Sequence, residues 1–461
     1  MTKIIKNISL VLVFIFILCS CAQEMEEIIP EFTVDGSSAD LGGFQCVWGY
    51  AGTAGETELG FVTGTKNADL LLERKAAVEK AMNCKITPNY TSSMYDFLRA
   101  GVMSGAQPFD IVEGDSYTMV VDVRAGNLSG LSGLLDIENV EKWGTPNMLQ
   151  SLIWKTDVFG VVPFAWPDIM YRQSGHVLAV NENLVSRLGQ PDPREYVEDG
   201  VWNWDTFEDV LEAYTYQDAG NTIYALRSHP PYFSINMFLS SGVALSAYQD
   251  GSVVSGVYTD IGRAALERAN TIFNVTHKDC FHPDTGSVGH EQFINNEAVM
   301  YLSWCYELTS GTSWIMYQMD NIGILPFPQG PDATPGVYLS YHEGLGNSTA
   351  IPFNAKDPNA SAVILSAMYE PFDEYKTKDD IIDYMTNQIF YDRKDAEIIA
   401  NVVRNTEYGF FREGARGVIE EAVKTEKGIA ALLDSYESRY DEIVTEYMIP
   451  HYQGRIAVYG E

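Results

Sequence analysis

Basic residues are scarce in this chain of 461 residues. There are 30 Lys and Arg against 63 Asp and Glu, which gives a formal net charge of −33 at pH 7. This imbalance excludes a protein that binds nucleic acid, because phosphate groups require a surface rich in Lys and Arg. It favours a soluble, self-repelling surface suited to a protein outside the cytosol, but it identifies no ligand.

Residues for metal or nucleophilic chemistry are also few. The chain has seven His and six Cys, and no spacing among them is that of a zinc site. Gly-x-Ser-x-Gly and P-loop motifs are missing, and the many carboxylates do not single out a glycosidase pair. We therefore expect neither an enzyme nor a metal or other cofactor. The sequence leaves open three disulfide pairings, or free thiols, for Cys46, Cys84, Cys280 and Cys305.

The N-terminal segment holds a strongly apolar run, residues 8–18, that is too short to span a membrane. It ends in Leu18-Cys19-Ser20-Cys21, which resembles the bacterial lipobox. On this interpretation residues 1–20 are a lipoprotein signal peptide, Cys21 carries the lipid, and residues 21–43 form a flexible acidic tether. The chain would then be extracytoplasmic and anchored to the cell membrane. The alternatives are an ordinary signal peptide and a Cys-x-Cys metal site.

The first third of the chain alternates strand and helix patterns. A length of 461 residues is too great for one hydrophobic core, so we expect two lobes. Strand patterns end near Trp48, Tyr50 and Asp115, with amphipathic helices between them, which is typical of a parallel α/β sheet. Ligands bind beyond the carboxyl ends of such strands, so the sequence places these three residues at a candidate site. The predicted strands are 44–50, 84–87 and 109–113, and the predicted helices are 66–82 and 95–104.

The remaining chain continues the α/β pattern and becomes mostly helical after residue 359. Asp205, with Glu208 three positions later, has the spacing of a helix-capping box. Asn296 lies where a helix must turn sharply into a strand, and Asn tolerates left-handed backbone there. That strand, residues 298–302, leads directly to Trp304 and Tyr306. Further strands are predicted at 177–181 and 321–328, and helices at 261–273, 360–369, 378–388, 395–404, 417–423 and 428–447.

Several segments, in this order, resemble the extracellular solute-binding proteins of ABC importers, namely the sugar-binding group (family 1) related to maltose-binding protein. The segments are "FDIVEGD", "GVVPFAW" with "VLAVNENLV", "GVWNWDTFEDVLEA", "FINNEAVMYLSW" and "IGILPFPQGPDA". The resemblance covers nearly the whole chain after the lipobox. Asn296 and Val299 replace the usual Gly and Ala, and residues 168–176 lengthen the first crossover between lobes.

The resemblance implies a type 2 periplasmic-binding-protein fold. Each of its two lobes would be a mostly parallel sheet flanked by helices, with a ligand cleft between the lobes and closure on binding. We expect a monomer. Lobe one would comprise residues 44–165 and 340–372, lobe two residues 175–338 and 373–461, and the hinge crossovers would lie near 166–176, 338–346 and 370–375.

A sugar site needs aromatic faces that stack on the ring and carboxylates or amides that bond its hydroxyls. Trp166 and Tyr171 lie in the first crossover, where hinge packing is the alternative. Trp202 and Trp204 are expected to pack at a helix start. The candidate ligand contacts are Trp48, Asp115, Trp166, Tyr171, Trp304, Tyr306, Tyr341 and His342.

These patterns and the resemblance lead to one functional hypothesis. The protein would be a lipid-anchored substrate-binding protein that captures a carbohydrate, most simply an oligosaccharide, and presents it to ABC transporter permease subunits. Two alternatives stay open at this point. One is the same fold with a polyamine or other cationic solute as ligand, and the other is an extracytoplasmic carbohydrate-active enzyme.

Overall fold

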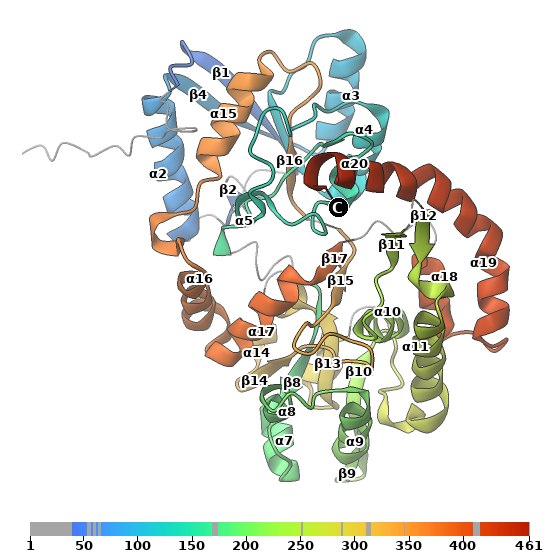
Figure 1. Ribbon diagram of the computed structural model, residues 1–461. Helices are drawn as coiled ribbons and strands as arrows, with labels where there is room; N and C mark the ends of the chain where they lie inside the picture. Colours follow the sequence, from blue (N-terminus) through green and yellow to red (C-terminus); the bar gives the residue numbers. More distant parts are fainter. Residues whose placement is uncertain are drawn as a thin grey trace, which may run out of the picture.

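The chain folds into two α/β lobes, which lie one above the other in Figure 1. The two-lobe α/β fold predicted from the sequence is therefore confirmed. The expected signal peptide, the lipid-bearing Cys21 and the candidate Tyr171 lie outside the described residues. This computed structural model describes residues 39–52, 57–58, 61–62, 66–167, 174–249, 252–286, 289–309, 315–344, 346–408 and 415–460.

The first lobe is built on a four-stranded sheet in the order β16-β5-β1-β4. β1 (Phe44–Ala51) runs parallel to β4 (Cys84–Thr91) and to β5 (Ile111–Gly114). β16 (Ser348–Ala350) joins the edge of the sheet antiparallel to β5. The carboxyl ends of β1, β4 and β5 therefore meet at one edge of the sheet, which is where the sequence predicts a ligand site.

Helices cover both faces of this sheet. α2 (Lys66–Ala81) and α15 (Pro358–Met368) contact each other on one face, and α3 (Met94–Ser104) and α4 (Ser116–Ala125) contact each other on the other. Asn83 has φ = 48°, so its left-handed backbone ends α2 and turns the chain into β4. The lobe is completed by β2 (Thr57–Glu58), β3 (Phe61–Val62), α5 (Val140–Trp143), β6 (Ile153–Trp154) and β7 (Asp157–Val158).

The second lobe is built on a five-stranded sheet in the order β14-β8-β13-β10-β9. β10 and β13 are parallel, but β8 is antiparallel to both of its neighbours, β13 and β14. The mostly parallel sheet expected for each lobe thus describes only the first. The reason is the path of the chain, because β8 leaves the junction between the lobes while β13 returns to it, and His176 pairs with Trp304. The strands are β8 (His176–Asn181), β9 (Tyr216–Asp218), β10 (Asn221–Ser228), β13 (Ala298–Trp304) and β14 (Ile322–Leu325).

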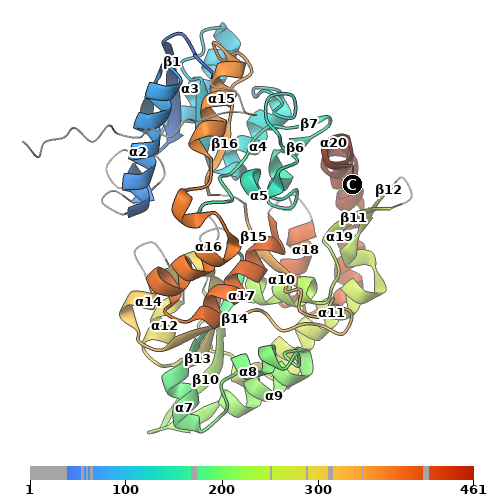
Figure 2. The same ribbon diagram turned by 60° about the vertical axis from the view of Figure 1, so that its left-hand side comes forward.

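Helices and small ribbons surround the second sheet (Figure 2). The elements outside the second sheet are α7 (Glu182–Leu188), α8 (Arg194–Glu198), α9 (Trp204–Tyr214), α10 (Pro230–Ser240), β11 (Ser246–Gln249), β12 (Ser252–Ser255), α11 (Asp260–Thr271), α12 (His290–Ile294), α13 (Cys305–Thr309), α14 (Ile315–Gln318), β15 (Ser340–His342), α16 (Lys378–Met385), α17 (Arg393–Arg404), β17 (Thr406–Tyr408), α18 (Ala415–Ala422), α19 (Ile429–Ile443) and α20 (Ile449–Tyr459). The predicted helical character beyond residue 359 is confirmed by α15 to α20.

One helix departs from the expected division into lobes. The sequence predicts residues 373–461 to belong to lobe two, yet α20 contacts β6 and β7, which belong with the first sheet. The β6–β7 ribbon is tied to that sheet because the Leu131 amide bonds the Val158 carbonyl and Val161 bridges Thr349 of β16. α20 therefore lies against the first lobe, at the end of a helical run that begins on the second (Figure 1).

Of two local predictions, the turn at Asn296 is confirmed and the capping box at Asp205 is wrong. Asn296 has φ = 62°, which confirms the left-handed turn into β13, and its side-chain oxygen accepts a hydrogen bond of 2.8 Å from Asn181. The capping box at Asp205 is wrong, because the N-cap of α9 lies two residues earlier, at Asn203, whose side chain accepts the bond from the Thr206 amide. Asp205 in the first turn instead pairs with Arg268 at 3.1 Å.

The four described cysteines are free. Cys46 and Cys84 lie on neighbouring strands as expected, but Cys46 pairs with Ile86 in the register, which sets the two thiols diagonally apart. Trp202 and Trp204 are buried, and their indole N–H groups donate to the Pro326 carbonyl and the Ser240 hydroxyl at 2.9 Å each.

Candidate functional site

In the first lobe, aromatic and acidic side chains gather at the carboxyl ends of β1, β4 and β5. The rings of Tyr50 and Tyr90 stack with centroids 5.0 Å apart, since β1 and β4 place these residues side by side. Asp115 follows β5 and caps α4, accepting a bond of 2.8 Å from the Thr118 amide. The Tyr95 hydroxyl donates to the Asp115 carbonyl at 2.8 Å. This edge therefore presents hydroxyl and carboxylate groups beside aromatic faces.

Glu113, the last acid of β5, is almost fully buried in the same region. Burial raises the pKa of its carboxyl to about 8, and the neighbouring donors Trp48, Tyr369 and Thr349 only partly oppose this shift. The hydroxyls of Tyr369 and Thr349 hydrogen-bond to each other. At neutral pH the side chain is thus largely a neutral acid that links β5 to β16 and to the segment after α15.

In the second lobe, a cluster of rings forms where β13 ends beside the start of β8. The Trp304 ring lies 3.9 Å from the ring of His176 and 4.9 Å from that of His342, measured between centroids. Its indole N–H donates to the Tyr232 hydroxyl at 3.1 Å. Trp304 remains partly exposed whereas His176 is fully buried, so the indole is held in one orientation with part of its surface accessible.

Polar groups lie at the carboxyl ends of β13 and β10. The Tyr301 hydroxyl donates to the Glu307 carboxylate at 3.0 Å, and Ser303 donates to the same carboxylate. His229, at the carboxyl end of β10, bonds the Thr285 carbonyl at 2.8 Å and lies edge-on to Tyr232. Burial lowers the pKa of His229, so its ring is held neutral.

The end of the first crossover, residues 174–176, lies beside the second crossover at the junction of the lobes. A Cβ on Gly175 would meet the Tyr341 carbonyl oxygen at 2.7 Å, so only glycine permits this approach. The Ser340 hydroxyl donates to the His176 carbonyl at 2.9 Å. Further on, a Cβ on Gly344 would lie 2.8 Å from the Ser116 hydroxyl of α4. The ring cluster of the second lobe is thereby connected to the start of α4 in the first.

The third crossover is fixed by an arginine and by aromatic packing. Arg74 of α2 donates to the carbonyls of Glu370 and Pro371, the latter at 2.9 Å, and its guanidinium lies 4.2 Å from the Phe372 ring centroid. Desolvation lowers the pKa of Arg74 to about 10. Trp166 stacks on Phe372 at 5.3 Å and donates to the Glu370 carbonyl at 3.3 Å.

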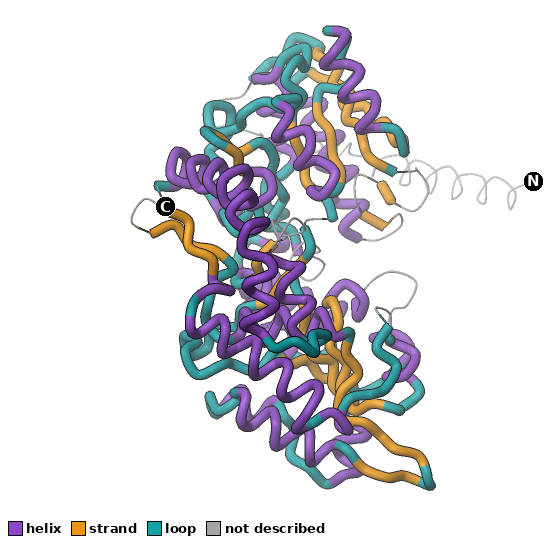
Figure 3. The backbone as a smooth tube through the Cα atoms, turned by 90° about the vertical axis from the view of Figure 1, so that its right-hand side faces the viewer, coloured by secondary structure: helices purple, strands orange, loops and turns teal. Residues whose placement is uncertain are grey.

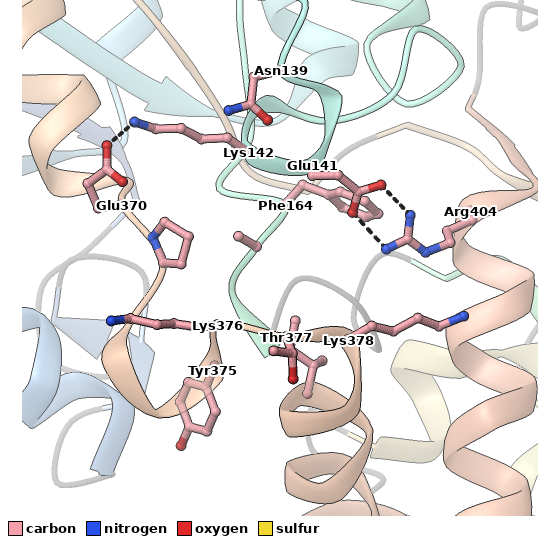
Figure 4. Close-up of a pocket in the computed structure, with 13 residues that line it drawn as sticks. Asn139, Glu141, Lys142, Phe164, Glu370, Tyr375, Lys376, Thr377, Lys378 and Arg404 are labelled. Carbon is pink, nitrogen blue, oxygen red and sulfur yellow. Dashed lines mark hydrogen bonds and ion pairs between the residues drawn. The ribbon is translucent and has the colours of Figure 1, made fainter. Parts of the chain in front are cut away.

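A cavity of about 220 Å³ lies beside this crossover, and its lining side chains are drawn in Figure 4. Two ion pairs cross it. Glu141 of α5 binds Arg404 of α17 through two contacts of 2.7 and 2.8 Å, and Lys142 binds Glu370. Among the described residues, none of the predicted ligand contacts lines this cavity. The pair of Glu141 with Arg404 joins the two lobes, whereas Lys142 and Glu370 both belong to the first. Lys376 and Lys378 also line the cavity, which is therefore a basic recess beside the hinge.

The structure separates the predicted contacts into three groups. Trp304 and His342 meet in the ring cluster with Tyr341, which is 2% exposed. Tyr306, 47% exposed, follows Trp304 on α13. The third group lies away from the ring cluster: Trp48 is buried in the core of the first lobe, Asp115 caps α4 and Trp166 packs in the hinge.

Sequence reasoning missed His176, Tyr232 and Glu113. His176 and Tyr232 reach Trp304 only through the pairing of β8 with β13 and the placement of α10, which no local pattern encodes. Glu113 falls in a predicted strand, and a carboxylate within an apolar strand pattern is a usable signal, since such a group is costly to bury without hydrogen-bond partners. Burial also lowers the pKa of His342 to about 4, which keeps this ring neutral beside Tyr408.

Within the described residues, no group of three His, Cys, Asp or Glu side chains is placed to hold a metal ion. None of the described helices combines the length and apolar character that crossing a bilayer requires.

Two α/β lobes, joined by crossovers that meet beside a ring cluster, define the class of two-lobe periplasmic-binding-protein folds. No sequence-family model matches the chain, and no curated protein matches it. Solved structures do match, and several of them are sugar-binding proteins.

The cyclic α-maltosyl-1,6-maltose binding protein from Arthrobacter globiformis superposes with a TM-score of 0.62 at 14% identity, over 87% of this chain and 99% of that one. The sugar-binding protein MalE from Xanthomonas citri gives 0.60 at 14% identity, over 87% and 98%. A sugar transporter from Rhizobium etli in an open conformation gives 0.59 at 14% identity, over 86% and 99%. This chain has the fold of the maltose-binding proteins over nearly all of its described length.

Proposed function

We propose that this protein is the extracytoplasmic substrate-binding component of an ABC importer and binds a carbohydrate between its lobes. The observation that supports this most directly is the ring cluster around Trp304. It lies where β13 ends, near the end of β10, and where the second crossover leads toward α4. In an α/β sheet this edge is the usual ligand position.

The chemistry of these two sheet edges suits a sugar. A partly exposed indole whose orientation is fixed by His176 and Tyr232 offers an apolar face to the C–H face of a pyranose ring. Carboxylates and phenol hydroxyls such as Asp115 and Tyr95 can bond sugar hydroxyls in fixed directions. The fold of the neighbours, which include a cyclo/maltodextrin-binding protein complexed with maltotetraose, agrees with an oligosaccharide as ligand.

The same proposal includes a membrane anchor and a permease. The lipobox-like sequence ending in Cys21 supports cleavage after Ser20 and lipid attachment to the Cys21 thiol. A tethered monomer would then present its ligand to permease subunits, and the ligand would act by favouring the closed arrangement of the lobes. Replacement of Cys21 by Ser should release the protein from the membrane fraction, and unchanged fractionation would reject the anchor.

Calorimetry with linear and cyclic maltodextrins tests the ligand class, with spermidine and putrescine as a parallel arm. We expect Trp304→Ala to weaken oligosaccharide binding about tenfold to a hundredfold, the scale of one stacked ring. Phe353→Ala removes an aromatic ring that is 64% exposed elsewhere and serves as the matched control. Binding of the amines alone would refute the carbohydrate proposal, and hydrolysis of the glycan would identify an enzyme instead.

A further inference from the structure

The C-terminal helices pass from the second lobe to the first. α19 is fixed on the second lobe, where Leu433 and Tyr440 enter a core cluster with residues of α10 and α18. The Tyr258 hydroxyl donates to the Leu433 carbonyl at 3.2 Å. Five residues of π-helix, Val444–Met448, follow, and then α20 runs along β6 and β7 of the first lobe. Figure 3 shows this helical run rising from the lower lobe to the upper one.

The sequence explains both the bend and the docking. Pro450 has no N–H, so the regular helical ladder is interrupted, and the π-helical segment ends two residues before it, at Met448. Gly454 allows α20 to approach the β6–β7 ribbon closely. A Cβ there would stand 2.8 Å from Cγ2 of Ile153 and 3.2 Å from the Trp154 backbone.

Polar contacts fasten α20 to the first lobe. The Lys155 amide donates to the Pro450 carbonyl at 2.7 Å. Arg455 donates to the Asn147 side chain at 3.0 Å. The guanidinium of Arg124 lies 4.2 Å from the ring centroid of Tyr447, just ahead of the helix.

α20 also retains a contact with the second lobe. The Tyr452 hydroxyl donates to the Ser246 carbonyl of β11 at 2.7 Å, and its ring stacks on Tyr248 with centroids 5.8 Å apart. One helix thus touches both lobes while its chain connection crosses between them. A rotation of the lobes must therefore bend the π-helical segment, break the Tyr452 contacts or lift α20 from the ribbon.

We propose that residues 429–459 form a fourth connection between the lobes, a C-terminal strap, which restrains their relative rotation. The strap flexes at Val444–Met448 and moves with the first lobe at its α20 end. Its docking on the β6–β7 ribbon stabilises the arrangement of lobes seen in Figure 1 against other angles. The proposal concerns the lobes themselves and stands without the carbohydrate assignment.

Gly454→Leu in the full chain tests the strap, because the added side chain collides with the ribbon. Gln453→Leu places the same side chain on the exposed neighbouring position and is the control. We expect amide hydrogen exchange in α20 to accelerate about tenfold or more in Gly454→Leu, the scale of an overpacked contact. The small-angle X-ray scattering of Gly454→Leu without ligand should then be described only by a mixture of interlobe angles. The scattering of the control should still fit a single angle.

A second variant ends the chain after Met448 and removes α20 altogether. Its scattering should change in the same way, with α19 still protected from exchange. If α20 is released or absent and the scattering still fits the single arrangement, the strap does not restrain the lobes. An equal change in Gln453→Leu would likewise overturn the proposal. Neither result depends on whether the protein binds a sugar.

Discussion

Replacing Glu113 by Gln should stabilise the protein at neutral and alkaline pH. The carboxyl of Glu113 is buried beside Trp48, Tyr369 and Thr349, and burial raises its pKa from 4.5 to about 8. The folded protein therefore keeps a proton that the unfolded chain releases above pH 4.5. An amide has the same shape and needs no such proton, and the hydroxyls of Tyr369 and Thr349 can each either donate to it or accept from it.

The size of the effect follows from this shift in pKa. A pH of 7 lies about 2.5 units above the pKa of 4.5 that the side chain has in the unfolded chain, and each pKa unit corresponds to about 1.4 kcal/mol. Holding the proton thus costs the folded state about 3.5 kcal/mol at pH 7. The stability contributed by a raised pKa is complete below pH 4.5 and is lost as the pH rises through 8. The free energy of unfolding of Glu113→Gln should therefore increase relative to that of the wild type throughout this window.

Urea unfolding of both proteins at pH values from 5 to 9 measures this difference. The gain of Glu113→Gln should be small at pH 5, increase by about 1.4 kcal/mol per pH unit and level off above pH 8. Glu138→Gln changes an exposed acid of the same lobe and should follow the wild type. If the difference between Glu113→Gln and the wild type is independent of pH, the carboxyl is not a buried neutral acid.

Three further substitutions test local features by thermal or urea unfolding. Asn203→Ala should lower the free energy of unfolding by about 1 kcal/mol through loss of the α9 cap, and Asp205→Ala should lower it by less than about 0.5 kcal/mol. A larger loss in Asp205→Ala would instead support a capping box at Asp205. Asn296→Val should cost about 1–2 kcal/mol because a β-branched residue is strained at φ = 62°, while Gly at this position should be tolerated; equal losses would point to the side chain instead. Glu141→Gln should cost at most about 1 kcal/mol, since the pair with Arg404 is partly exposed, and high salt should remove the difference; a loss unaffected by salt would contradict an ion pair.

The fold could be predicted because its signals are local and repeated. Strand and helix periods alternate from residue 44 onward, and Asn83 and Asn296 mark turns that need left-handed backbone. The mixed second sheet could not be predicted in this way. Strand direction depends on which side of the lobe the chain enters, and periodicity carries no such information.

The candidate site was predictable only in part. Trp304 follows a buried strand and so falls at the edge of a sheet, which is visible in the sequence. Its partners His176 and Tyr232 come from distant segments, and the contacts depend on strand register and helix placement. Trp48 was placed at the rim of the first lobe, but β1 continues to Ala51, which leaves the ring inside the core.

Gly175 has a consequence for how the hinge can turn. It brings the end of the first crossover against Ser340 and Tyr341 of the second, so that the two segments are in direct contact at this point. A rotation of the lobes that passes through this point must therefore carry both segments together. A side chain at position 175 would collide with the Tyr341 carbonyl and separate them.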